Sequence, residues 1–100
     1  MVRVHYLKTW PTFFSAVKAG EKPFELRKDD RLYDVGDILI LQYWDPDVAA
    51  KDKSPSGGYT GEEIRGKVTY LLLANESGAL VAGFCAMGVR WDLPAIPRNP

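Results

Sequence analysis

The sequence predicts an α+β fold, a small mixed β-barrel of five or six strands with one or two flanking helices. The chain has 100 residues, of which 46% are apolar, and this is enough for one domain with one modest core. Strand-like segments outnumber helical ones and have short connections, whereas a parallel α/β sheet would need more helices. We therefore expect a single domain over residues 1–92 and a proline-rich coil tail over residues 93–100.

The first third of the chain predicts a strand, a helix and a second strand. Apolar residues alternate over Val2–Leu7, as in a half-buried strand. A helix begins at Pro11, where the missing N–H costs nothing, with Thr9 as its candidate cap. Gly20 ends this helix in a left-handed stop, and the second strand follows over Phe24–Leu26. The apolar stripe expected to pack the helix on the core is Phe13, Phe14 and Val17.

The rest of the chain predicts three further strands separated by polar connections. A charged bend at 28–31 and a turn at 35–37 precede the segment 38–44, which is apolar on both faces and is therefore expected to be the central strand. The segment Asp45–Gly58 reads as a long loop, either mobile or functional. The remaining segments are a strand at 65–73, a turn at 75–78 and a last strand at 80–89.

Charge and cysteine content exclude several classes of function. Thirteen basic residues balance thirteen acidic ones, whereas a protein that grips a long phosphate backbone usually carries a basic excess. We therefore expect no extended duplex footprint. The single Cys85 excludes an intrachain disulfide and is expected to be a small buried hydrophobe. No apolar run approaches the roughly 20 residues of a membrane span, and we find no signal peptide, so a cytoplasmic location without a membrane partner is expected.

Lys22, Glu25 and Arg27 form the most informative polar cluster in the sequence. Phe24 and Leu26 are expected to face the core, which would place Glu25 and Arg27 together on the opposite face of the strand. Lys22 is expected in the turn that precedes this strand. The alternative is an exposed strand edge with a solvated ion pair, which would stabilise the fold by at most about 1 kcal/mol.

Four other residues are candidates for contact with a ligand. Tyr59 can stack on a base, and Thr60 can donate a hydrogen bond or act as a nucleophile. Trp44 borders the long loop and can form a stacking wall, and His5 is the single histidine. Each has a structural alternative: a packed turn for Tyr59 and Thr60, a core position for Trp44, and a structural role for His5. The spacing of His5 and the carboxylates does not suit a metal site, so no metal or cofactor is expected.

Five separated motifs carry a resemblance to a known family. They are Gly20-x-Lys22-x-x-Glu25-x-Arg27, His5-x-Leu7-Lys8-x-Trp10-Pro11, Phe24-Glu25-Leu26-Arg27-Lys28-x-Asp30-Arg31, Val35-Gly36-Asp37 and Tyr59-Thr60-Gly61. Together they resemble the ASCH superfamily, whose signature is GxKxxExR, and within it a compact subfamily of phages and bacteria. The resemblance covers roughly residues 5 to 87. It implies a PUA-like fold with a cleft lined by the lysine, glutamate and arginine of the signature.

The resemblance also implies a function, because members of the superfamily are thought to bind RNA or modified nucleobases. Some are amidohydrolases that remove acyl groups from N4 of cytosine nucleosides, using the signature lysine, a threonine three residues later and a distant glutamate. Lys22 matches that lysine, but Glu25 stands where the threonine would be. Lys22 would then act as the base, and either Thr60 or a water molecule as the nucleophile. Glu76 is a candidate for the distant glutamate.

Two readings assign a function to the cleft, and a third is an interaction protein whose cleft is incidental. The first is a domain that recognises a nucleobase or nucleoside in a Lys/Glu/Arg-lined cleft and deacylates N4-acylated cytosine nucleosides such as N4-acetylcytidine. The alternative is a non-catalytic binding module for single-stranded RNA or modified nucleobases. The candidate catalytic residues are Lys22, Glu25 and Thr60, and the candidate ligand-binding residues are Arg27, Tyr59, His5 and Trp44.

Overall fold

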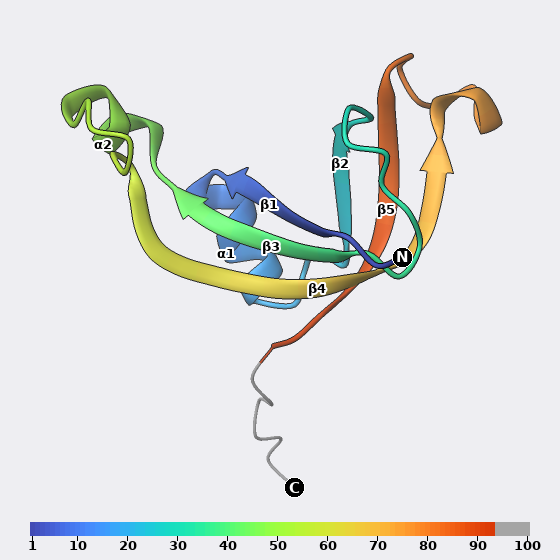
Figure 1. Ribbon diagram of the computed structural model, residues 1–100, viewed down its shortest axis with the longest axis horizontal. Coiled ribbons are helices and arrows are strands. Elements are labelled where there is room, and N and C mark those ends of the chain that lie inside the picture. The colour runs from blue at the N-terminus through green and yellow to red at the C-terminus, as the bar shows by residue number, and fades with distance from the viewer. Residues whose placement is uncertain (94–100) are drawn as a thin grey trace, which may run out of the picture.

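A single curved sheet of five strands organises the molecule (Figure 1). The structure is a computed structural model that describes residues 1–93, so the predicted tail, Leu93 apart, lies outside the described residues. The strands are β1 (Val4–Thr9), β2 (Phe24–Lys28), β3 (Ile38–Trp44), β4 (Tyr59–Leu73) and β5 (Phe84–Trp91). They curl into half a barrel, which confirms a small α+β, barrel-like fold with five strands.

The strand order is β1-β3-β4-β5-β2, which leaves β1 and β2 at the two edges. β1 pairs with β3 in parallel, and the other neighbours are antiparallel. The middle strand is therefore β4, not the segment 38–44 that we expected there. β4 is also longer than predicted, with 15 residues from Tyr59 onward. The first half of β4 is polar, so its sequence does not show the apolar alternation that predicts a strand. Backbone pairing with β3, from Trp44 to Ile38, holds this half in the sheet.

Two predicted segments have different boundaries in the structure. The loop Asp45–Gly58 contains a short helix, α2 (Pro46–Lys51), whose first turn is capped by the Asp45 carboxylate accepting from the backbone N–H of Asp47. The last strand starts at Phe84 and not at residue 80, because its neighbour β2 ends where Lys28 pairs with Phe84. The predicted turn at 75–78 overlaps a single 3-10 turn at Ala74–Glu76.

The first helix, α1 (Pro11–Lys18), covers one face of the sheet and ends before Gly20, which has the expected left-handed conformation with φ of 78°. Two corrections apply. Thr9 is not its cap, because Trp10 occupies the cap position and the Thr9 hydroxyl donates to Leu7 O. Phe13 is exposed and does not pack in the core. Among residues 1–93, no helix is long and apolar enough to cross a membrane.

The core lies between α1 and the concave face of the sheet. Burial raises the pKa of the Cys85 thiol, as do the neighbouring carboxylates of Asp29 and Asp30, so this free cysteine is an inert core residue as expected. The buried apolar residues are Leu7, Phe14, Val17, Tyr33, Leu39, Leu41, Ile64, Val68, Cys85, Met87 and Val89.

Candidate functional site

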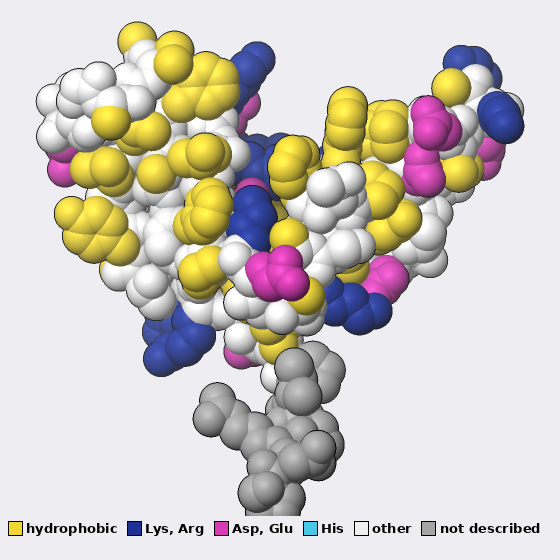
Figure 2. Space-filling view, turned by 180° about the vertical axis from the view of Figure 1, so that it is seen from behind, with side chains coloured by type: hydrophobic (Ala, Val, Ile, Leu, Met, Phe, Trp, Pro, Cys, Tyr) yellow, Lys and Arg dark blue, Asp and Glu magenta, His cyan; other side chains and the backbone are white. Residues whose placement is uncertain are grey.

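A cleft of about 560 Å³ opens between the start of α1 and the edge strand β2. Its lining residues come from the end of β1, from α1, from the turn before β2 and from β2 itself: Thr9, Trp10, Phe13, Lys22, Phe24, Glu25, Leu26 and Arg27. Figure 2 shows basic side chains at the bottom of a notch between two lobes rich in hydrophobic side chains. The cleft therefore combines apolar walls with a charged floor.

The floor is a three-residue ion cluster centred on the Glu25 carboxylate. Lys22 Nζ lies 2.6 Å from Glu25 Oε1, and Arg27 Nε lies 2.9 Å from Glu25 Oε2. The side chain of Glu25 is only 3% exposed, while those of Lys22 and Arg27 are 16% and 25% exposed. A buried carboxylate is tolerated when cations and hydrogen bonds satisfy it, and here each oxygen has its own cation.

The structure inverts the expected faces of β2. Glu25 and Arg27 do share one face, but it faces inward, whereas Phe24 and Leu26 are 43% and 56% exposed. An apolar residue in an alternating strand is normally assigned to the core. Here the two apolar residues form a wall of the cleft, and Lys22, which precedes the strand as expected, neutralises the charge on the inward face.

Arg27 links the floor of the cleft to the opposite edge strand. Its guanidinium donates from Nη1 to Lys8 O and from Nη2 to Thr9 Oγ1, both at 3.2 Å. Thr9 is 3% exposed and provides the hydroxyl group of the cleft. The sequence pattern did not indicate it, although it follows His5 and Leu7 on the buried face of β1.

Tyr59 and Thr60, which were predicted to bind or act on the ligand, do not line the cleft. They begin β4, where Tyr59 pairs with Trp44 of β3. The Thr60 hydroxyl is exposed and accepts a hydrogen bond from the backbone N–H of Glu62 at 3.2 Å. Glu76 is exposed in the 3-10 turn and also lies outside the cleft lining. The hydroxyl and the distant glutamate that the resemblance led us to place with Lys22 are therefore not assembled there.

Trp44 is also absent from the cleft lining and is committed to two other contacts. Its indole Nε1 donates to Gly57 O at 3.1 Å, which fastens the segment after α2 to the end of β3. The ammonium of Lys8 lies 4.2 Å from the centre of its ring, in a cation–π contact. Trp44 thus stabilises the end of β3 and the segment that returns to it.

His5 belongs to a buried polar cluster near the start of β1, at the other end of the strand from Thr9. Its Nε2 donates to Asp37 Oδ2 at 2.8 Å, and its ring contacts Tyr33 with the centres 4.7 Å apart. Asp37 also accepts from the backbone N–H groups of Arg3 and Asp34. Burial acts to raise the pKa of Asp37, but the hydrogen bonds from His5 and the two backbone groups outweigh it and lower the pKa. This cluster is structural and ties the 34–37 turn to β1.

The cleft lies within the part of the chain that matches other proteins. Residues 4–89 match a family model described as a domain of unknown function (DUF3850). The chain is also 33% identical over 69 residues to a protein of Escherichia phage P2 described as "Uncharacterized 12.9 kDa protein in GpA 3'region". That similarity covers 69% of this chain and 54% of the phage protein, so the chain spans about half the length of that relative. Since the family match covers most of the chain and includes every residue of the cleft, the chain belongs to the DUF3850 family.

Proposed function

We propose that the cleft binds a nucleobase that carries an exocyclic amine, with cytosine as the best fit, and that the domain is a PUA-like member of the ASCH superfamily. The observation that carries this proposal is the Glu25 carboxylate, held between two cations at the bottom of a cleft with aromatic walls. Neutral overall charge supports it as well, because reading a single base requires few phosphate contacts.

The walls suit a flat heterocycle. Trp10 and Phe13, each about half exposed, line the cleft on the α1 side, and Phe24 and Leu26 line it on the β2 side. Large apolar side chains left exposed around a cleft are typical of ligand sites, and about 560 Å³ falls within the usual range for small-molecule pockets. Stacking of a base on an aromatic side chain stabilises a complex by about 1–3 kcal/mol.

The floor suits the pairing edge of cytosine. Glu25 accepts from the exocyclic amine, as carboxylates do when they read cytosine N4. Lys22 and Arg27, which both lie against Glu25, donate to the ring nitrogen and the carbonyl oxygen. Uracil has a carbonyl where cytosine has the amine, so it would place an acceptor, and no N–H donor, against the Glu25 carboxylate. We expect cytidine to bind about thirtyfold more tightly than uridine, which corresponds to about 2 kcal/mol.

Titration calorimetry with cytidine and uridine tests the proposal. Glu25→Gln removes the negative charge and should abolish the preference for cytidine. Glu62→Gln is a matched control, since Glu62 also pairs with a lysine, Lys18, but on the exposed surface. Phe13→Ala, at a position 52% exposed and therefore harmless to folding, should weaken cytidine binding about tenfold through lost stacking. Equal affinity for the two nucleosides in the unaltered protein would reject the proposal.

Hydrolysis of an N4-acyl group is a second candidate, favoured by the Thr9 hydroxyl that lines the cleft with Lys22 and Glu25. Water would add to the acyl carbon, and the cytosine amine would leave with a proton. Two contacts argue for binding instead. The Thr9 hydroxyl donates to Leu7 O, and Lys22 pairs with Glu25, so neither group is poised as nucleophile or base. Incubation with N4-acetylcytidine, followed by detection of cytidine and acetate, decides between the two.

A further inference from the structure

A second, smaller hollow of about 180 Å³ lies beside the cleft and shares Arg27 with it. It lies at the far end of β2 and in the segment that follows, and it reaches the middle of β1. Its lining residues are Leu7, Arg27, Lys28, Asp30, Arg31 and Tyr33. Because one guanidinium borders both hollows, a ligand of nucleotide size can occupy them together.

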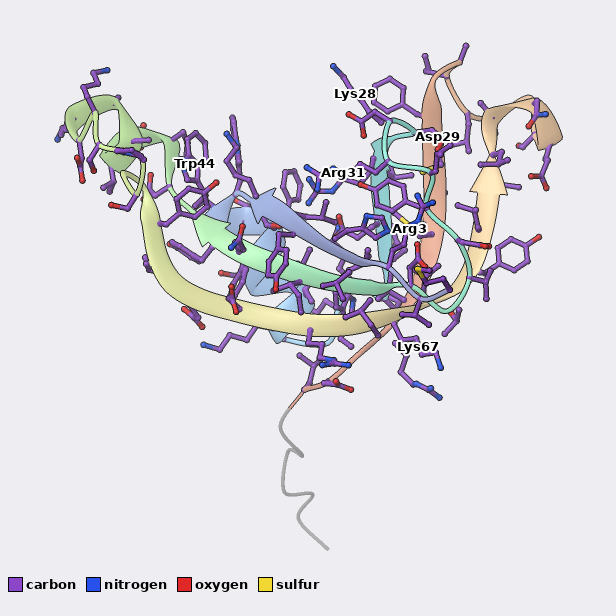
Figure 3. The ribbon with its side chains drawn as sticks, viewed as in Figure 1. Arg3, Lys28, Asp29, Arg31, Trp44 and Lys67 are labelled. Carbon is purple, nitrogen blue, oxygen red and sulfur yellow. The ribbon has the colours of Figure 1, made fainter. Side chains whose placement is uncertain are left out.

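The charges of this hollow are mainly positive. Its lining residues include three cations, Arg27, Lys28 and Arg31, and one carboxylate, Asp30. Figure 3 shows Lys28 and Arg31 near the end of β2, with Asp29 on the side of β5. The backbone N–H of Asp29 donates to Gly83 O, which fits that placement. The cleft floor next to it has one carboxylate for two cations, so the two hollows together favour an anion.

Both arginines are held in place by the open edge of β1. Arg31 Nη1 donates to Tyr6 O at 2.8 Å, and Arg27 Nη1 donates to Lys8 O at 3.2 Å. A guanidinium has several N–H groups in a planar fork. Within residues 1–93, Arg31 uses only this one hydrogen bond, so further N–H groups are left for a ligand. A guanidinium that is already oriented loses less entropy when it binds a phosphate.

Tyr33 adds a neutral hydrogen-bond donor to the lining. Burial raises the pKa of its phenol, and the nearby Arg31 and Arg27 only partly oppose this. The hydroxyl therefore stays protonated at neutral pH and does not bring a negative charge into the hollow.

We infer that this hollow is a phosphate subsite, so that the ligand is a nucleotide whose base lies in the cleft and whose phosphate lies against Arg27, Lys28 and Arg31. The inference rests on the proposed function for the base and adds the phosphate to it. The phosphate belongs either to a free nucleotide, as a monoester, or to single-stranded RNA, as a diester.

The test compares the affinities of cytidine, cytidine 5′-monophosphate and cytidine 3′-monophosphate by calorimetry. At least one monophosphate should bind about tenfold more tightly than cytidine, as expected for charge-assisted hydrogen bonds. That gain should shrink with added salt, because exposed charges are screened. In the Lys28→Ala/Arg31→Gln double variant, the ratio of nucleotide to nucleoside affinity should fall to about one. Lys67→Ala, an exposed lysine of β4 on the outside of the sheet, is the matched control and should keep the gain.

The outcomes separate this inference from the proposed function. If cytidine binds and neither monophosphate binds more tightly, the phosphate subsite is rejected while the base site stands. If cytidine does not bind but ribose 5-phosphate does, and the double variant loses it, the subsite stands and the base site is rejected. If none of these compounds binds, both fail. A single-stranded tricytidylate that binds more tightly than either monophosphate identifies RNA as the source of the phosphate, and the reverse order identifies a free nucleotide.

Discussion

Two buried carboxylates, Glu25 and Asp37, differ in their hydrogen-bond partners and therefore in their roles. Glu25 is 2% exposed and its partners are two side-chain cations beside a cleft. Asp37 is 1% exposed and its partners are His5 and backbone N–H groups. A carboxylate satisfied by side chains at a cleft can exchange one partner for a ligand, whereas one satisfied by the backbone can only hold the fold. The first is therefore a functional candidate and the second a structural one.

The first prediction at the residue scale concerns acid stability. The pKa of Asp37 is lowered from its usual 3.8, so folding favours the charged form of this residue. Its contribution to stability is complete above the unfolded-state pKa and is lost as the pH falls through the lowered folded-state pKa. Asp37→Asn should therefore lower the free energy of unfolding at pH 7 by about 1–3 kcal/mol.

The measurement is urea unfolding between pH 2 and pH 7. The variant should lose less stability than the parent protein as the pH is lowered below 4, because the titrating group is gone. Asp47→Asn, at an exposed position in α2, is the control and should follow the parent. An unchanged acid limb in Asp37→Asn would show that another group governs acid unfolding.

At the scale of elements, the pairing of β4 with β5 supports the cleft from behind. Trp91, near the end of β5, pairs with Gly66 of β4, and its indole Nε1 donates to Lys22 O at 2.9 Å. The turn that carries Lys22 into the cleft is thereby fixed by a strand that also places Cys85, Met87 and Val89 in the core. Gly66 makes this possible because it leaves room for the indole ring.

Gly66→Ala should therefore weaken both stability and ligand binding. A Cβ at this position would lie 2.7 Å from Val89 Cγ1 and closer still to the ring of Trp91. Overpacking of this kind destabilises a fold by about 1–3 kcal/mol, and displacing Trp91 also displaces Lys22. Thermal unfolding and cytidine titration measure the two effects. Gly78→Ala, where a Cβ meets nothing within 4 Å, is the control. Unchanged cytidine affinity in Gly66→Ala would separate Trp91 from the site.

At the scale of the whole molecule, the two edges of the sheet are connected by side chains and not by backbone hydrogen bonds between strands. β1 and β2 are the edge strands. Arg27 and Arg31 cross between them and bind carbonyl groups of Tyr6 and Lys8. These contacts occupy acceptors that an exposed edge would otherwise offer to another strand. The cleft and the phosphate subsite lie along this junction, so ligand binding and closure of the half-barrel involve the same groups.

Arg27→Lys tests this junction. A lysine ammonium cannot reproduce the planar fork that contacts Glu25, Lys8 and Thr9 together. We expect the free energy of unfolding to fall by about 2 kcal/mol and amide hydrogen exchange to become faster in both edge strands. Arg90→Lys, on an exposed position of β5, is the matched control. Slow exchange retained in β1 and β2 would show that the sheet holds its curvature without the arginine.

Local periodicity and short spacing in the sequence were enough to predict a small α+β, barrel-like fold, the segments of α1 and β3, and the grouping of Lys22, Glu25 and Arg27. Tertiary structure was needed to establish which face of β2 is buried, because alternation is the same for either face and the ion cluster makes the charged face the inner one. It also brought Thr9 to the cleft and left Tyr59 and Thr60 outside it. Those placements depend on the order of strands in the sheet. β1 pairs with β3 on one side, and its other side is open to the Arg27 side chain. No local sequence pattern encodes such long-range pairing.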